Sequence, residues 1–198
     1  MNIHQLSVNY LPEQDRILVR INTTAGQELR VWFTRRLTLG FAPLLTKVVA
    51  EQVAKLEATK SPYITPAATA DVHTQQMLSE FKKAQALEKS DFQTPYNSQP
   101  AALPLGEEPL LITEVNLTPL AAGQLQIAFN EQLPSPAKQR GFKVVLEPTL
   151  VHGFTHLLDK AIHNSLWRQE AEPAGHHAPS DTLPGELMAG GDKPRYLN

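Results

Sequence analysis

An eleven-residue pattern that occurs twice constrains the fold of this chain more than any other feature of its sequence. Both copies read L-x-x-G-F-x-x-L-L-x-K, and they occupy residues 37–47 and 150–160 of a chain of 198 residues. Their apolar residues recur at three- and four-residue spacing, which is typical of one face of a helix. Each copy therefore predicts a helix, and the repetition predicts two copies of one supersecondary unit.

Alternating apolar and polar residues precede both copies of the pattern, as expected for half-buried strands. In the first half the apolar positions are Leu6, Val8, Tyr10, Ile17, Val19, Ile21, Leu29, Val31 and Phe33. In the second half the matching positions are Val115, Leu125, Ile127, Phe129, Phe142, Val144 and Leu146, with Val115 aligned to Val8. Each half is thus predicted to contain three antiparallel strands followed by a helix.

The expected fold class is α+β, with one βββα unit at residues 1–58 and a second at residues 109–170. A single unit of this kind covers one face of its sheet and leaves the other face and the sheet edges open. Two units related by a pseudo-two-fold axis can close on each other, as the protomers of a dimer do. The alternative is that two unrelated units share a generic apolar pattern.

Two proline-rich stretches lie outside these units. Ten of the 16 prolines fall within residues 60–109 and 171–198, where they disfavour both helices and sheet ladders. Residues 59–108 are therefore predicted to be a linker, interrupted by one helix at about residues 71–89. The apolar stripe of that helix, Met77, Leu78, Phe81 and Ala84, is thin, so we expect the helix to be loosely docked. Residues 171–198 are predicted to form a disordered tail.

Composition excludes several classes of protein. The chain has 18 basic and 20 acidic residues and no cysteine. Without cysteine there is no disulfide framework, cysteine zinc site, iron–sulfur cluster or thiol nucleophile. The formal net charge of -2 argues against a strongly basic nucleic-acid binder, although a local basic patch remains compatible with it.

Targeting and catalytic motifs are missing from the sequence. The N-terminal residues do not combine a basic segment with an apolar run, and no stretch reaches the roughly 20 apolar residues of a membrane span. We therefore expect a cytoplasmic protein without membrane contact. The motifs of nucleotide-binding loops, zinc proteases and serine hydrolases are also missing. We expect no catalytic residues, no enzymatic activity and no cofactor.

Two short segments of the first half carry a family resemblance. YLPEQDRIL at residues 10–18 and RVWFTRR at residues 30–36 resemble a family of proteobacterial proteins. That family has no known activity, so the resemblance implies no functional residue.

The outward side of the first predicted sheet is the main candidate binding surface. If the apolar positions of the strands face the helix, the alternate positions face away from it and present arginines beside an aromatic ring. Together with two arginines after the third strand, the candidate residues are Arg16, Leu18, Arg20, Arg30, Trp32, Arg35 and Arg36. Trp and Arg are enriched at interface hot spots, which favours a protein partner or self-association, with packing inside the chain as a further interpretation.

The same residues also allow a different interpretation, single-stranded nucleic-acid binding. In that hypothesis Trp32 stacks on a base and the arginines contact phosphates.

A second alternative is metal binding by a polar stripe on the second helix. His152, His156, Asp159 and His163 follow one another at spacings of four, three and four residues. Histidines at i and i+4 can reach one metal ion, and an aspartate can supply a third ligand. The competing interpretation is a solvated helix face, because the stripe lies opposite the apolar residues of the helix.

Overall fold

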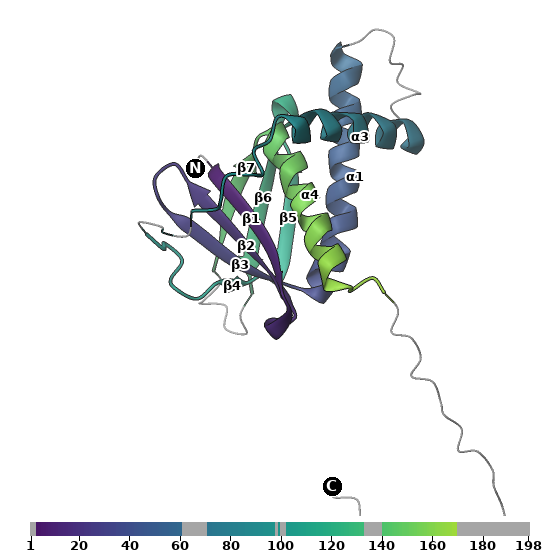
Figure 1. The fold of residues 1–198 in the computed structure, drawn as a ribbon. Coiled ribbons are helices and arrows are strands. Elements are labelled where there is room, and N and C mark those ends of the chain that lie inside the picture. Colours follow the sequence, from purple (N-terminus) through teal and green to yellow (C-terminus); the bar gives the residue numbers. More distant parts are fainter. Residues whose placement is uncertain (1–2, 61–70, 98, 100–101, 133–139, 170–198) are drawn as a thin grey trace, which may run out of the picture. The chain divides into compact units, whose positions relative to one another are not determined.

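Two β-sheets and three α-helices make up the part of the chain that the computed structural model describes, residues 3–60, 71–97, 99, 102–132 and 140–169 (Figure 1). The predicted α+β class is therefore confirmed. The predicted tail at residues 171–198 and residues 61–70 of the predicted linker lie outside the described residues.

The first half contains the three predicted strands and a long helix. Strands β1 (Ile3–Leu11), β2 (Arg16–Thr23) and β3 (Glu28–Thr34) pair antiparallel in that order, and helix α1 (Arg35–Lys60) follows. A short 3-10 turn (Pro12–Gln14) links β1 to β2. Strand β4 (Leu110–Leu111) joins this sheet by pairing parallel with β3. The first sheet thus includes residues that the sequence assigned to the second unit.

The second half repeats the order of three strands and a helix. Strands β5 (Glu114–Pro119), β6 (Leu125–Glu131) and β7 (Arg140–Leu146) pair antiparallel, and helix α4 (Pro148–Ser165) follows. A 3-10 turn (Ala121–Gly123) again links the first two strands. The predicted strand faces are correct, because the matched apolar residues of the second and third strands pair across each sheet. These pairs are Ile17–Phe33, Val19–Val31 and Ile21–Leu29 in the first sheet and Leu125–Leu146, Ile127–Val144 and Phe129–Phe142 in the second.

The sequence alignment of the first strands is wrong by two residues. Val8 lies opposite Val19, whereas Val115 lies opposite Phe129, which matches Ile21 of the first half. By strand register, Val115 therefore corresponds to Leu6. A shift of two residues keeps every side chain on the same face of a strand, so the alternating pattern does not reveal it.

One hydrophobic core contains side chains from both halves. The Phe33 and Phe129 rings meet between the two sheets at a centroid distance of 5.8 Å, and the Phe41 and Phe154 rings of the two helices meet at 6.3 Å. Helix α4 packs against β1, and helix α1 packs against β5. Each helix thus contacts the first strand of the other half.

Helix α3 (Val72–Glu88) confirms the predicted helix in the linker, but its predicted apolar face points the wrong way. Met77 and Phe81 are 62% and 58% exposed. The helix crosses α1 (Figure 1) and is held by ion pairs, Lys82 with Glu57 of α1 at 3.2 Å and Lys83 with Asp159 of α4 at 3.6 Å. Its docking is therefore polar where the sequence suggested an apolar stripe.

The remaining described linker residues lack regular secondary structure, as predicted, but they are bound to the first sheet. Asn97 accepts a hydrogen bond from Asn22 at 2.8 Å through its carbonyl oxygen. The backbone N–H of Glu28 donates to the Ala102 carbonyl at 3.0 Å. The linker thus contacts Asn22 on the outward side of β2 at Asn97 and lies along the edge of β3 at Ala102, next to the predicted binding residues.

Helix α1 differs from two expectations. Leu44, which the sequence placed on its buried stripe, is 49% exposed, whereas Leu45 is fully buried.

By length and composition α1 could also cross a membrane, although the sequence was expected to contain no membrane span, and 44% of its most apolar window is buried inside the structure. A core helix passes the same test, so this finding is weak evidence for a membrane span.

Candidate functional site

The outer face of the first sheet brings three apolar side chains into one row. Strand register places Leu18 of β2 opposite Trp32 of β3, and Trp32 opposite Leu111 of β4. All three residues are partly exposed, so Trp32 is neither a core residue nor a free surface residue. We call Leu18, Trp32 and Leu111 the apolar row. Sequence reasoning found the first two members and missed Leu111, because only the fold brings residue 111 beside β3.

The arginines around the row are not equivalent. The Arg20 guanidinium lies 4.3 Å from the centre of the Tyr96 ring, and Arg30 forms an ion pair with the buried Glu28 carboxylate. The Tyr96 hydroxyl donates to Glu28 at 3.0 Å. Burial raises the pKa of Tyr96, and the adjacent Glu28 carboxylate raises it further, so this phenol remains protonated. Arg20 therefore holds the linker through Tyr96, and Arg30 is paired with a carboxylate of its own strand, β3.

The other predicted arginines lie at the end of the sheet and the start of α1. Arg35 donates to the Trp167 carbonyl oxygen at 2.8 Å and so ties α1 to the end of α4. Arg16 and Arg36 make no hydrogen bond or ion pair with any residue that the structure describes. These two guanidinium groups are available to a partner.

A groove continues from the apolar row along α1. It has a volume of about 520 Å³ and is lined by Arg36, Leu37, Gly40 and Leu44 of α1 together with Leu111 and Val115. A Cβ atom added to Gly40 would meet nothing within 4 Å, which shows that this side of α1 is open. Sequence reasoning missed the groove because it placed Leu44 in the core.

The four residues of the predicted metal stripe on α4 have different surroundings in the structure. His152 is buried, the His156 ring contacts the Phe92 ring at 5.6 Å, Asp159 pairs with Lys83, and His163 is exposed. Within the described residues, no three His, Asp or Glu side chains gather closely enough to hold a metal ion. The expectation that the stripe faces solvent is wrong for His152, because α3 covers that end of α4.

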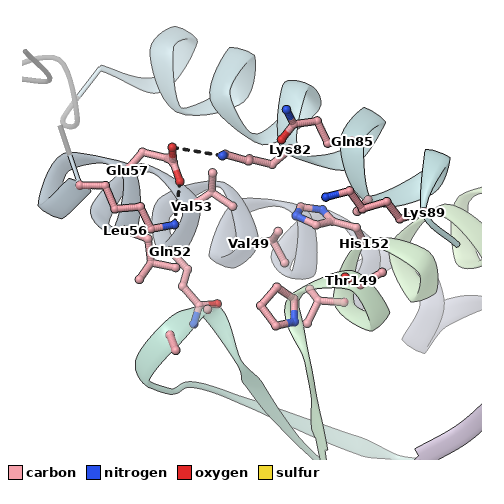
Figure 2. A pocket seen from close by; sticks show the side chains of 16 residues that line it. Val49, Gln52, Val53, Leu56, Glu57, Lys82, Gln85, Lys89, Thr149 and His152 are labelled. Atoms are coloured by element: carbon pink, nitrogen blue, oxygen red, sulfur yellow. Dashed lines mark hydrogen bonds and ion pairs between the residues drawn. The ribbon is translucent and has the colours of Figure 1, made fainter.

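A smaller pocket of about 200 Å³ lies between α1, α3 and α4 (Figure 2). Its rim carries Glu57, which accepts hydrogen bonds or ion pairs from Lys60 at 3.1 Å and Lys82 at 3.2 Å. Burial raises the pKa of Glu57, but the two lysines outweigh burial, so the pKa lies below its ordinary value. His152 forms part of the wall, and burial lowers its pKa, with the nearby Lys83 ammonium lowering it further.

Because the pKa of His152 is lowered by folding, we expect the stability of the protein to depend on pH. The unfolded histidine titrates at about pH 6.5, so near pH 6 the unfolded chain binds more protons than the folded chain. The free energy of unfolding should therefore fall as the pH drops from 7 through this range, by about 1.4 kcal/mol for each unit of pKa difference. Urea unfolding of the wild type and His152→Leu should show this slope only in the wild type. The exposed His163→Gln variant should keep the slope, and equal slopes in all three proteins would contradict the prediction.

Comparisons of the chain with protein-family models, with curated proteins and with solved structures find no match. The candidate surfaces are therefore interpreted from their own geometry and chemistry.

Proposed function

We propose that this protein is a non-catalytic interaction module of the bacterial cytoplasm, and that it binds an acidic segment of a partner protein. The binding surface in this proposal is the apolar row together with the groove along α1. The resemblance to a proteobacterial family stays a prediction and contributes no residue to the proposal.

The observation that carries the proposal is the continuity of this apolar surface. Leu111 belongs both to the row and to the lining of the groove, so the surface runs from β2 across β3 and β4 to α1. Leu44 at the far end is 49% exposed. Contiguous apolar surface of this kind marks contact sites on proteins, whereas a single exposed leucine needs no explanation.

Charge selects the chemistry of the partner. Arg36 lines the groove, and Arg16 lies two residues before Leu18 on β2, opposite Thr34 of the groove lining. Neither arginine has a hydrogen bond or ion pair with a described residue. Arginine binds carboxylates through paired N–H donors, so a segment with acidic residues flanking apolar ones complements the surface. The two guanidinium groups would give orientation and association rate, while the apolar contacts would supply most of the affinity.

Single-stranded nucleic acid is the less favoured occupant of the same surface. A nucleic-acid site needs cations that reach phosphates next to an aromatic ring that stacks on bases. Arg20 is stacked on Tyr96, and Arg30 is paired with Glu28, so two of the cations nearest Trp32 are already engaged.

We further propose that the two halves are duplicated βββα units related by a pseudo-two-fold axis. Two residues at the same place in the repeated pattern, Phe41 and Phe154, contact each other, as residues on a two-fold axis do. The packing is also reciprocal, since α4 contacts β1 while α1 contacts β5. The matched pairs of the second and third strands support the same relation. In this proposal the two duplicated units form the core together, and β4, which belongs only to the first sheet, makes the outer face of that sheet different from the outer face of the second.

The binding proposal is tested by selecting peptides from a random display library against the folded chain. We expect the selected peptides to combine acidic and large apolar residues, and to bind Leu44→Glu at least 10-fold more weakly than the wild type. Met77→Glu is the matched control, because Met77 is also an exposed apolar helix residue and lies outside the surface. Arg36→Gln should weaken binding and reduce its dependence on salt.

Three results would overturn the proposal. The first is that no peptide is selected, and the second is that Leu44→Glu and Met77→Glu weaken binding equally. The third is salt-dependent binding of a single-stranded oligonucleotide that Trp32→Ala abolishes while its melting temperature shows the variant to be folded, which would assign the surface to nucleic acid.

A further inference from the structure

The pocket between α1, α3 and α4 is lined by both apolar and polar side chains. Its walls include Val49, Val53 and Leu56 from α1 and Pro148 and Val151 from α4 (Figure 2). The volume of about 200 Å³ corresponds to roughly six or seven water molecules at about 30 Å³ each. A space of this size accommodates a small organic molecule.

The floor of the pocket is fixed by hydrogen bonds. The Gln52 amide donates to the carbonyl oxygens of Leu120 at 3.0 Å and Gln124 at 2.7 Å, which holds α1 to the loop that carries Gly123. A Cβ atom on Gly123 would lie 3.0 Å from Leu56, so the loop approaches α1 as closely as a glycine allows. A pocket on such a floor is largely preformed, which lowers the cost of ligand binding.

The rim of the pocket is positively charged. Lys60, Lys82 and Lys89 carry three positive charges and Glu57 carries one negative charge, which leaves a formal excess of two positive charges. Lys60 and Lys82 share the Glu57 carboxylate. Lys89 has no ion pair with any described residue, and Figure 2 shows its side chain directed into the space between the helices. Lys89 is therefore the cation best placed to meet an incoming anion.

His152 supplies a polar group inside the pocket. The residue is only 5% exposed, and its ring makes no hydrogen bond to a described residue. Burial lowers the pKa of this imidazole, the Lys83 ammonium lowers it further, and together they outweigh the Glu80 carboxylate, which raises it. The ring is therefore neutral near pH 7, a form in which one ring nitrogen donates a hydrogen bond. An anion beside the ring would favour the protonated form, because an opposite charge raises the pKa of a histidine. Anion binding would then be coupled to proton uptake by His152.

From this arrangement we propose that the pocket binds a small organic monocarboxylate, with its apolar body between α1 and α4 and its carboxylate between Lys89 and His152. Three features specify this class of ligand. The apolar part of the walls selects an apolar body, the volume favours a small ligand, and the cationic rim with the buried imidazole selects a carboxylate. This inference is independent of the proposed partner-binding surface, which lies at the other end of α1 and contains none of these residues.

The proposal is tested by isothermal titration of the full chain with hexanoate, with 1-hexanol and acetate as the two partial probes. We expect saturable binding of hexanoate, and binding of hexanol and acetate at least 10-fold weaker, because each lacks one half of the recognised chemistry. Lys89→Gln should reduce the affinity for hexanoate about 10-fold, as expected for a lost charge-assisted hydrogen bond. Lys47→Gln is the control, since Lys47 is an exposed lysine of α1 outside the pocket.

A second measurement locates the ligand. NMR titration of the His152 ring should show a higher pKa in the presence of hexanoate than in its absence. Equal affinities for hexanoate and hexanol, equal effects of Lys89→Gln and Lys47→Gln, or hexanoate binding without a change at His152 would each overturn the proposal. Both lysines are exposed, so neither variant is expected to unfold.

Discussion

Replacing Phe33 with alanine is expected to lower the free energy of unfolding by about 3–5 kcal/mol. The Phe33 side chain is fully buried, and its ring contacts the Phe41 ring of α1 and the Phe129 ring of the second sheet, each at 5.8 Å. Alanine would leave a cavity where the first sheet, the second sheet and α1 meet. Denaturant unfolding followed by circular dichroism measures this loss.

The matched control for this variant is Phe92→Ala. Phe92 is 47% exposed and packs by its edge against His156, so its removal should cost less than about 1 kcal/mol. A double-mutant cycle of Phe33 and Phe129 should give a coupling of about 0.5–1.5 kcal/mol, the usual value for an aromatic pair. Similar losses for Phe33→Ala and Phe92→Ala would mean that the two sheets do not share a core.

The strands and their buried faces could be predicted from the sequence because each depends on local information. Val19 and Val31 lie on the inner face since a strand alternates strictly, and half of each alternating segment has to be buried. The helices could be predicted in the same way, because apolar residues at three- and four-residue spacing form one face of a helix. The order of elements in both halves was therefore accessible from one sequence.

Most of the incorrect predictions concern side chains whose surroundings are set by residues far away in the sequence. The burial of His152 requires α3, which lies about 70 residues earlier in the chain, and the engagement of Arg20 requires Tyr96 of the linker. Leu44 fits an apolar helical stripe, but α1 buries Phe41, Ala42 and Leu45 in the core and leaves Leu44 half exposed. Local patterns limit which faces are apolar, and tertiary packing decides which of those faces are covered.

The candidate binding surface was predicted only in part for the same reason. The outward position of Trp32 follows from alternation, but the position of Leu111 depends on a parallel pairing between β3 and a two-residue strand in a proline-rich segment. No periodicity marks a strand that short. The backbone N–H of Ile112 donates to the Trp32 carbonyl at 3.1 Å, and the N–H of Leu111 donates to the Glu131 carboxylate at 2.9 Å. Glu131 therefore holds β4 between the two sheets.

Removing the charge partner of Glu131 is the second large effect that we expect. The Glu131 side chain is 6% exposed, accepts a hydrogen bond from Arg140 at 2.7 Å and forms an ion pair with the same guanidinium at 2.6 Å. Arg140→Ala would leave the carboxylate buried without a cation, and breaking such a pair costs about 3–5 kcal/mol when both partners are buried. Because the Arg140 side chain is 47% exposed, we expect about 3 kcal/mol, measured by urea unfolding at pH 7.

A rescue variant separates the buried charge from lost packing. Adding Glu131→Gln to Arg140→Ala removes the uncompensated charge and keeps an oxygen that accepts the Leu111 N–H, so most of the lost stability should return. Lys47→Ala, which breaks an exposed pair with Glu51, should change stability by less than about 0.5 kcal/mol. If the double variant is no more stable than Arg140→Ala, the loss comes from packing of the arginine stem. If the buried charge is the cause, hydrogen exchange at Leu111 should be faster in Arg140→Ala than in the double variant, because a carboxylate without its cation is drawn toward solvent and away from the Leu111 N–H.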